Sequence, residues 1–294
     1  MNLLSGLEKL GLKIERIDNL FEDTEENRRK NPETSKPESK EKLETDFLVL
    51  KTVRCPICEH QFKSKVVKSS KLQRLDSDDD LRPRYRYIDI LKYGVTSCPQ
   101  CKYSALNDRF IHLAPVQIRL VREGVYARLD GESLGGAVIR HDEDLTPYDY
   151  DTAIERHKLA IFSTMVKKGR DSEIAYTCLK LAWLYREKRK EVSRTAPEKL
   201  WLIEKTRREE EAFYEQAYKG FEKAMLKEDF PISGMNEATL EYLMAVMSFR
   251  MGRYDDAAKL IGTIVISRQA NEKIKDKARD LKEKVLEAKR NKEI

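Results

Sequence analysis

The sequence lacks the apolar stretches that membrane-spanning and exported proteins need. Its 294 residues contain no apolar run near about 20 residues, the length of a transmembrane helix, and the mean hydropathy is -0.66. Charged residues interrupt positions 1–21 too often for the apolar region of a signal peptide. We therefore expect no membrane span and a cytoplasmic location.

The sequence also lacks the motifs that common enzymes share. It shows no nucleophile–histidine–acid triad, no glycine loop for phosphates and no paired carboxylates arranged for acid–base catalysis. Hydrophobic residues make up 40% of the chain, which suffices for a sizeable core. We therefore predict a folded protein that is not an enzyme.

Cysteine is scarce, but its placement is informative. Four of the five cysteines form two pairs of one pattern, Cys55-Pro-Ile-Cys58 and Cys98-Pro-Gln-Cys101. Two such turns can complete a tetrahedral shell of four sulfurs around one ion, and the absence of an export signal disfavours disulfides. The spacing predicts a structural zinc ion held by Cys55, Cys58, Cys98 and Cys101. A shell filled by protein sulfurs leaves no position for a catalytic water.

Other interpretations of the cysteines stay open. An iron–sulfur cluster also uses four cysteines, whereas a thioredoxin-type redox motif needs a single pair in a βαβ unit. His60 lies two residues after Cys58 and is a conceivable ligand, but with four cysteines present we expect it outside the shell. Cys178 lies on the apolar stripe of a predicted helix, so we expect it in the core.

The positive charge is concentrated around the cysteines. Residues 51–102 contain twelve Lys or Arg and six Asp or Glu, an excess of +6 that equals the net charge of the whole chain. Four thiolates would add −4 and the zinc ion +2, which would reduce this excess to about +4. A nucleic-acid-binding regulator is therefore the alternative function, with Tyr85 or Tyr87 stacking on bases. Its basic residues would be Lys63, Lys65, Lys68, Lys71, Arg82, Arg84 and Arg86.

An acidic stretch interrupts this basic region at Asp76, Asp78, Asp79 and Asp80. Mixed charge of this kind is more typical of a solvated surface than of a phosphate-binding track. A third hypothesis is an enzyme in which residues 76–80 hold a second metal ion.

The composition divides the chain into five segments. They are an amphipathic helix (1–21), a disordered charged linker (22–46), a zinc-binding ribbon-like module (47–110), a connecting region (111–149) and a helical domain (150–294). The first helix has an apolar stripe at heptad spacing, so it can pack on the body of the protein, bind a partner or self-associate. The linker is nearly all charged or small, with Pro32 and Pro37.

Local patterns predict the elements of the two domains. We expect strands near 47–50, 66–67 and 87–95 and a helix near 116–122. From 150 onward the pattern is helical, with helices over 171–190, 201–227, 236–251 and 273–290 and another beginning near 255. The fold class is therefore α+β, with a small zinc-ribbon-like β module followed by a mainly helical domain.

The helical domain carries signs of a tetratricopeptide-like repeat. Ala245, Gly252, Tyr254 and Ala257 occupy the offsets of small and turn residues in that repeat. The earlier helix has the small and aromatic positions, but its turn is stretched through 191–197, so the period is irregular. A non-repeating helical bundle is the alternative.

Four stretches of the sequence also carry a family resemblance. They are Cys55-Pro-Ile-Cys58 with Ser70-Lys-Leu72, Asp76-Ser-Asp78 and Arg82-Pro-Arg-Tyr85; Cys98-Pro-Gln-Cys101 with Tyr103-Ser-Ala105; His157-Lys-Leu-Ala-Ile161 with 179–187; and Asp229-Phe-Pro-Ile232 with 234–239 and Tyr242-Leu243. Over roughly residues 50–290 the chain resembles a bacterial family catalogued as domain of unknown function 2225. The resemblance implies a zinc-ribbon-like module joined to tetratricopeptide-like helices, and it implies no reaction.

The chain departs from the family pattern after each cysteine pair. The family usually has Gly there, because the chain turns with positive φ, whereas this chain has Glu59 and Lys102. The leading hypothesis is a cytoplasmic zinc-binding adaptor or scaffold whose tetratricopeptide-like helices bind a protein or peptide partner.

Overall fold

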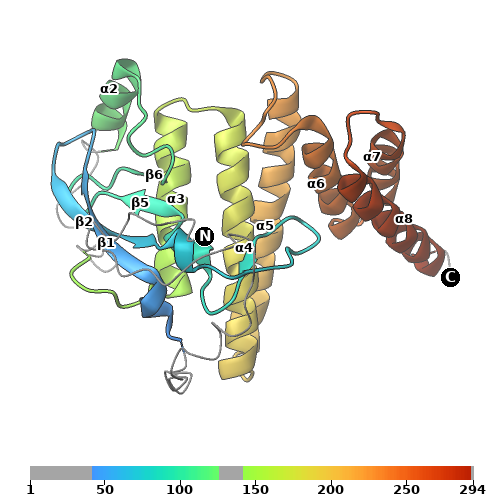
Figure 1. The fold of residues 1–294 in the computed structure, drawn as a ribbon, viewed down its shortest axis with the longest axis horizontal. Coiled ribbons are helices and arrows are strands. Elements are labelled where there is room, and N and C mark those ends of the chain that lie inside the picture. The colour runs from blue at the N-terminus through green and yellow to red at the C-terminus, as the bar shows by residue number, and fades with distance from the viewer. Residues whose placement is uncertain (1–41, 126–141, 293–294) are drawn as a thin grey trace, which may run out of the picture. The chain divides into compact units, whose positions relative to one another are not determined.

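The computed structural model describes residues 42–125 and 142–292 (Figure 1). The backbone divides into two units, Met1–Lys42 and Leu43–Ile294, and all described elements lie in the second. The expected helix at 1–21, most of the expected linker and the middle of the connecting region lie outside the described residues. No helix in the described ranges combines the length and the apolar character needed to cross a membrane.

Two antiparallel hairpins form the β module. Strands β1 (Leu48–Arg54) and β2 (Gln61–Val67) pair in register from Leu48 opposite Val67 to Arg54 opposite Gln61. Strands β5 (Val95–Ser97) and β6 (Ser104–Leu106) pair with Val95 opposite Leu106. The strands expected near 47–50 and 66–67 are therefore confirmed.

The ordered chain begins earlier than the composition indicates. The 3-10 helix η2 (Glu44–Phe47) includes three residues that we assigned to the linker. It is held because Phe47 is buried and the Glu44 carboxylate accepts hydrogen bonds from Lys92 Nζ and the Tyr93 hydroxyl, both at 2.8 Å. These anchoring residues lie almost fifty positions away, so local composition does not reveal them.

The strand expected over 87–95 is wrong over most of its length. The 3-10 helix η4 (Ile90–Tyr93) occupies that place, and β5 begins only at Val95. Asp89 accepts a hydrogen bond from the Leu91 amide at 3.1 Å, which starts the turn. The apolar side chains of this stretch therefore reach the core from a helical turn rather than from a strand.

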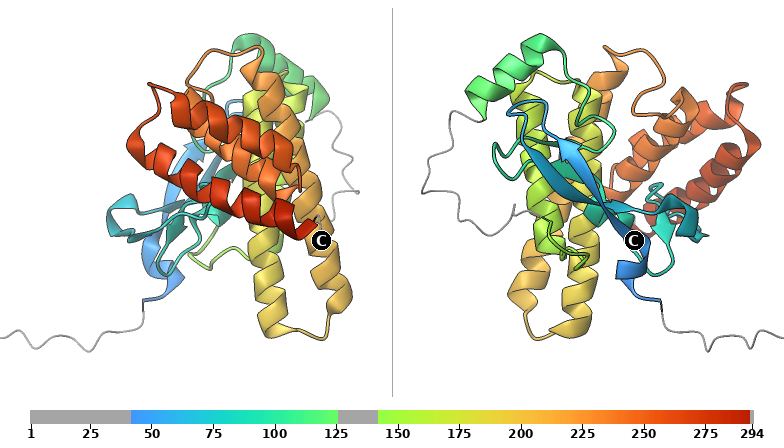
Figure 2. Two further views of the ribbon diagram at one scale, coloured as in Figure 1. Left: turned by 90° about the vertical axis from the view of Figure 1, so that its right-hand side faces the viewer. Right: turned by 60° about the vertical axis from the view of Figure 1, so that its left-hand side comes forward.

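The helices follow the expected pattern. They are α2 (Pro115–Gly124), α3 (Tyr150–Val166), α4 (Asp171–Thr195), α5 (Leu200–Met225), α6 (Glu237–Arg250), α7 (Tyr254–Ile266) and α8 (Glu272–Lys292). Asp149 and Asn236 cap α3 and α6 by accepting from backbone amides three residues on. The stretched turn expected over 191–197 is wrong for residues 191–195, because helix α4 continues to Thr195. Helices α4 and α5 lie side by side (Figure 2).

The hydrophobic cores confirm the α+β architecture. The largest core joins α3, α4, α5 and α6 around Trp183 and Leu179, and a second core joins α6, α7 and α8. A third core surrounds the cysteines and includes Val121 and Val125 at the end of α2.

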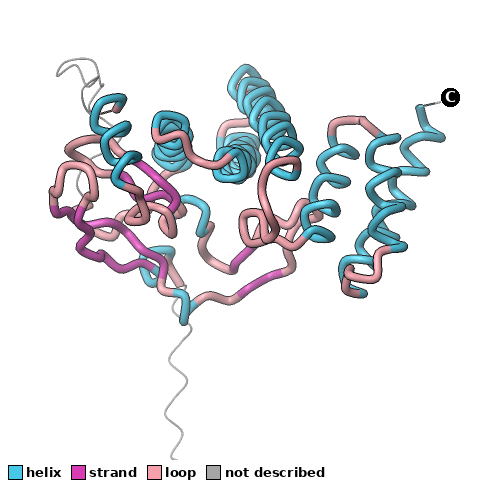
Figure 3. Tube along the Cα trace, turned by 90° about the horizontal axis from the view of Figure 1, so that it is seen from above, coloured by secondary structure: helices cyan, strands magenta, loops and turns pink. Residues whose placement is uncertain are grey.

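An arm between the two cysteine loops links the β module to the helices. We use this name for residues 72–89, which contain the short paired strands β3 (Arg74–Leu75) and β4 (Arg84–Tyr85). Figure 3 shows these strands extending toward the helices, and Leu81 packs against both helical cores. The β module and the helical domain are therefore joined by more than their connecting chain.

Candidate metal centre

Each cysteine pair lies in the loop that closes a hairpin. In the first loop the Cys55 amide donates to the His60 carbonyl at 2.9 Å, and the Glu59 amide donates to the Cys55 carbonyl at 3.0 Å. The second loop repeats both bonds, from Cys98 to Tyr103 at 2.9 Å and from Lys102 to Cys98 at 3.0 Å. The two pairs are therefore presented by loops with the same hydrogen-bonding pattern.

The residue after each pair adopts the left-handed conformation. Glu59 has φ 63° and Lys102 has φ 59°, as expected at the positions where the family usually has Gly. This conformation costs a residue with a side chain about 1 kcal/mol. Both side chains make local contacts: Glu59 pairs with Arg54 at 2.5 Å, and Lys102 Nζ donates to the Pro99 carbonyl at 2.7 Å.

The structure brings all four predicted ligands together. Their sulfur atoms lie within 4.8 Å of one another, with 3.5 Å between Cys55 and Cys101 and 3.6 Å between Cys58 and Cys98. A tetrahedron with bonds of about 2.3 Å has edges of about 3.8 Å, whereas a disulfide needs about 2.05 Å. The spacing therefore suits four ligands of one ion. Within the described ranges, no other group of three or more His, Cys, Asp or Glu side chains has such an arrangement.

Three of the four thiols have shifted pKa values because they lie so close together. Hydrogen bonds from Cys101 and Cys55 lower the pKa of Cys98 to about 2. The hydrogen bond with Cys101 acts to lower the pKa of Cys55, but the bond with Cys98 and burial raise it to about 12. Hydrogen bonds with Cys55 and Cys98 raise the pKa of Cys101. The Cys98 thiol thus ionises readily while Cys55 and Cys101 hold their protons, and a bound cation would allow these two to ionise as well.

Aromatic side chains surround the sulfur cluster. Tyr103 stacks on Phe110 with ring centres 5.0 Å apart, and Phe62 meets Phe110 edge-on at 6.1 Å. Cys55, Cys98 and Cys101 are buried, and Cys58 is partly exposed. These rings exclude water from most of the cluster, which is typical of a closed structural site.

The centre is also attached to helices outside the β module. Arg122 of α2 donates to the Ile57 carbonyl at 2.9 Å, and the Ser104 amide donates to Ser163 of α3 at 3.2 Å. Loss of a bound ion would therefore disturb α2 as well as the two hairpins.

His60 and Cys178, the two other residues considered as ligand or core residues from the sequence, both pack against neighbouring side chains rather than joining the sulfur cluster. His60 stacks on Phe62 with ring centres 6.4 Å apart and is not a member of the four-sulfur group. Cys178 lies in the main helical core, and burial raises the pKa of its thiol to about 12.

The acidic stretch does not form a second metal site in the described structure. Asp80 is fully buried, and its Oδ2 atom lies 2.9 Å from Trp183 Nε1, 2.8 Å from Arg186 and 3.3 Å from Arg250. Asp79 pairs with Lys284 at 2.8 Å. These carboxylates therefore face basic side chains on separate helices rather than a common ion.

Two of the seven basic residues proposed for nucleic-acid binding are buried. Lys65 pairs with Asp142 at 3.3 Å, and Arg82 pairs with Asp89 and Glu187, both at 3.0 Å. They are satisfied inside the protein, so their predicted role on a basic surface is wrong. The others are Lys63, Lys68, Lys71, Arg84 and Arg86, and most of these are exposed.

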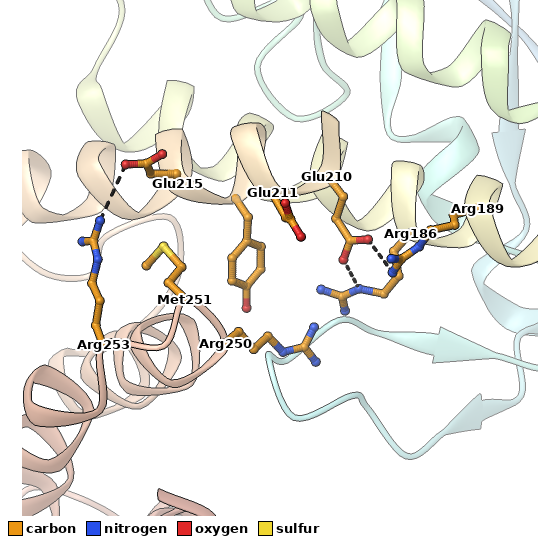
Figure 4. Close-up of a pocket in the computed structure, with 9 residues that line it drawn as sticks. Arg186, Arg189, Glu210, Glu211, Glu215, Arg250, Met251 and Arg253 are labelled. Carbon is orange, nitrogen blue, oxygen red and sulfur yellow. Dashed lines mark hydrogen bonds and ion pairs between the residues drawn. The ribbon is translucent and has the colours of Figure 1, made fainter. Parts of the chain in front are cut away.

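Sequence reasoning missed a charged pocket of about 500 Å³ on the helical domain (Figure 4). Its lining residues are Arg186, Arg189, Glu210, Glu211, Tyr214, Glu215, Arg250, Met251 and Arg253. Arg186 and Arg189, three positions apart on α4, both pair with Glu210 of α5 at 2.8 Å. The three-residue spacing of the two arginines indicates that they share one helix face. Their partner on α5 could not be identified from the sequence, because it lies on another helix. Asp80 of the arm fixes both Arg186 and Arg250.

Comparison with known proteins yields one family. The model of a family described as uncharacterized protein conserved in bacteria (DUF2225) matches residues 48–285. This range includes both cysteine loops, the arm and all helices from α2 to α7. No curated protein and no solved structure matches the chain. The chain therefore belongs to the bacterial family DUF2225.

Proposed function

We propose that this protein is a cytoplasmic adaptor with a structural zinc ion and no catalytic activity. The observation that carries the proposal is the charged pocket between α4, α5 and α6, which presents arginines and glutamates to solvent next to an aromatic side chain. In the proposal, the zinc centre fixes the two hairpins and the arm, and the arm fixes the arginines of the pocket.

Zinc is the proposed ion because of the ligand chemistry. Four thiolates in a tetrahedral shell suit zinc, and a shell without an open position suits a structural role. An iron–sulfur cluster remains the alternative. Elemental analysis of purified protein tests the assignment, with one zinc per chain expected and iron with visible absorption contradicting it.

The charges of the pocket favour a protein or peptide over a nucleic acid. Glu211 and Glu215 would repel phosphates, whereas Arg250 and Arg253, each about one-third exposed, can form charge-assisted hydrogen bonds with carboxylates. A peptide with both acidic and basic side chains would match both walls.

A double charge reversal tests this function. Affinity capture with the full chain identifies a partner, which is then titrated against the wild type and an E211K/R253E variant. We expect affinity to fall about tenfold or more in the variant. The control is R268E, because Arg268 is exposed and does not line this pocket. Equal affinity of the wild type and the double variant would contradict the proposal.

A further inference from the structure

An apolar groove of about 290 Å³ runs between α7 and α8. Figure 2 shows these two helices next to each other near the C-terminus. Ile261 and Val285 are buried at the groove, while Ile266 at the end of α7 and Leu286 on α8 are 82% and 39% exposed. The groove therefore has an apolar lining with two partly or largely exposed side chains at its edge.

Gly262 keeps this groove open. It lies inside α7, where glycine costs about 1 kcal/mol relative to alanine. A Cβ added at Gly262 would meet no atom within 4 Å, so no contact among the described residues requires glycine there. The missing side chain leaves open space on this side of α7, where a side chain of another molecule can approach the helix backbone.

The rim of the groove is basic. Lys282 and Lys289 are seven positions apart, which places them on one side of α8 beside the groove. Lys289 pairs with Asp255 at 2.5 Å, whereas no ion pair within the described ranges involves Lys282. Residues 272–291 contain eight Lys or Arg and five Asp or Glu. Lys282 therefore leaves a positive charge on the rim without an ion-pair partner among the described residues, and this charge attracts an acidic side chain.

We propose that this groove binds an amphipathic helix of a partner protein, with apolar residues three and four positions apart and acidic residues beside them. The inference rests on the proposed adaptor function in one respect: the groove would be a second binding surface of the adaptor, formed by different residues from those of the charged pocket. The volume lies at the lower limit of small-molecule pockets, about 300 Å³. A symmetric contact between two copies would place the basic rim of α8 opposite itself, which disfavours a second copy.

The probe for the test is a fluorescein-labelled designed helix of about 18 residues, roughly five turns. It carries Leu on one face with Glu beside it, and a second peptide has Lys in place of Glu. Fluorescence anisotropy is measured with the full zinc-loaded chain. We expect the acidic peptide to bind about tenfold more tightly than the basic one, and K282E to reduce that preference.

Filling the groove is the decisive step. The G262L variant should lose about tenfold or more in affinity for the acidic peptide, with equal or higher thermal stability, because a glycine is removed from a helix at a position where an added Cβ has open space. T263L adds the same side chain beside the groove and should bind as the wild type does. Unchanged binding by G262L, or equal binding of both peptides, would overturn the proposal.

Two further outcomes separate this inference from its alternatives. A dimer in sedimentation that dissociates in G262L would show that a second copy fills the groove, and would overturn it. E211K/R253E should bind the acidic peptide normally. Peptide binding retained in that variant while the partner of the charged pocket is lost distinguishes the two surfaces.

Discussion

Asp80 should be one of the most important single side chains for stability. The buried Oδ2 atom faces Trp183 Nε1 at 2.9 Å, Arg186 at 2.8 Å, and Arg250 and the Tyr214 hydroxyl at 3.3 Å. Removing one partner of a buried ion pair costs about 3–5 kcal/mol because the other charge stays buried without compensation. Arg186 keeps Glu210 at 2.8 Å, so we expect the lower end of that range.

The assay is urea unfolding of the full chain. D80N should lower the free energy of unfolding by about 3 kcal/mol, which corresponds to a decrease in Tm of about 6–12 °C for a domain of this size. The matched control is D79N, because Asp79 is 58% exposed and pairs with Lys284 at the surface. It should cost less than about 1 kcal/mol. A D80N cost no larger than that of D79N would refute the reasoning.

The pH dependence gives a second reading of the same residue. Burial acts to raise the pKa of Asp80, but Arg186 and Arg250 outweigh it and hold the pKa below its usual 3.8. A carboxylate with a lowered folded-state pKa stabilises the protein fully above the unfolded pKa and loses that contribution as pH falls through the folded value. The difference between wild type and D80N should therefore be constant near neutral pH and shrink below pH 3.8.

Three other predictions follow from the centre and the helices. C98S should lose most bound zinc and protection of the hairpins and α2 from hydrogen exchange, whereas C178S should keep its zinc; equal zinc in both variants would contradict the site. Burial lowers the pKa of His157 to about 3. The urea concentration at half unfolding should therefore decrease as the pH falls below about 6.5, and should decrease less in H157Q. The same pH dependence in both proteins would contradict this role of His157. A gel-shift titration with DNA and RNA should show no strongly salt-dependent binding, and a steep salt dependence would favour the nucleic-acid alternative.

The grouping of the four cysteines could be predicted because its information is local. Two residues separate the cysteines in each pair, and that spacing is enough to indicate a shared ion. The family resemblance also implied positive φ after each pair, and Glu59 and Lys102 adopt it. The helices could be predicted from apolar periodicity.

The electrostatic roles could not be predicted because they depend on distant partners. Lys65 reads as a surface lysine until Asp142, 77 positions away, is placed beside it. Asp80 reads as part of an acidic surface until Arg186, 106 positions away, is placed beside it. Charge patterns along the chain therefore say little about which charges the fold leaves exposed.

X-ray absorption at the zinc edge of the purified full chain tests the central claim most directly. The account predicts one zinc per chain with four sulfur neighbours at about 2.3 Å. Nitrogen or oxygen neighbours in place of one or more sulfurs, or a metal signal from iron alone, would contradict it.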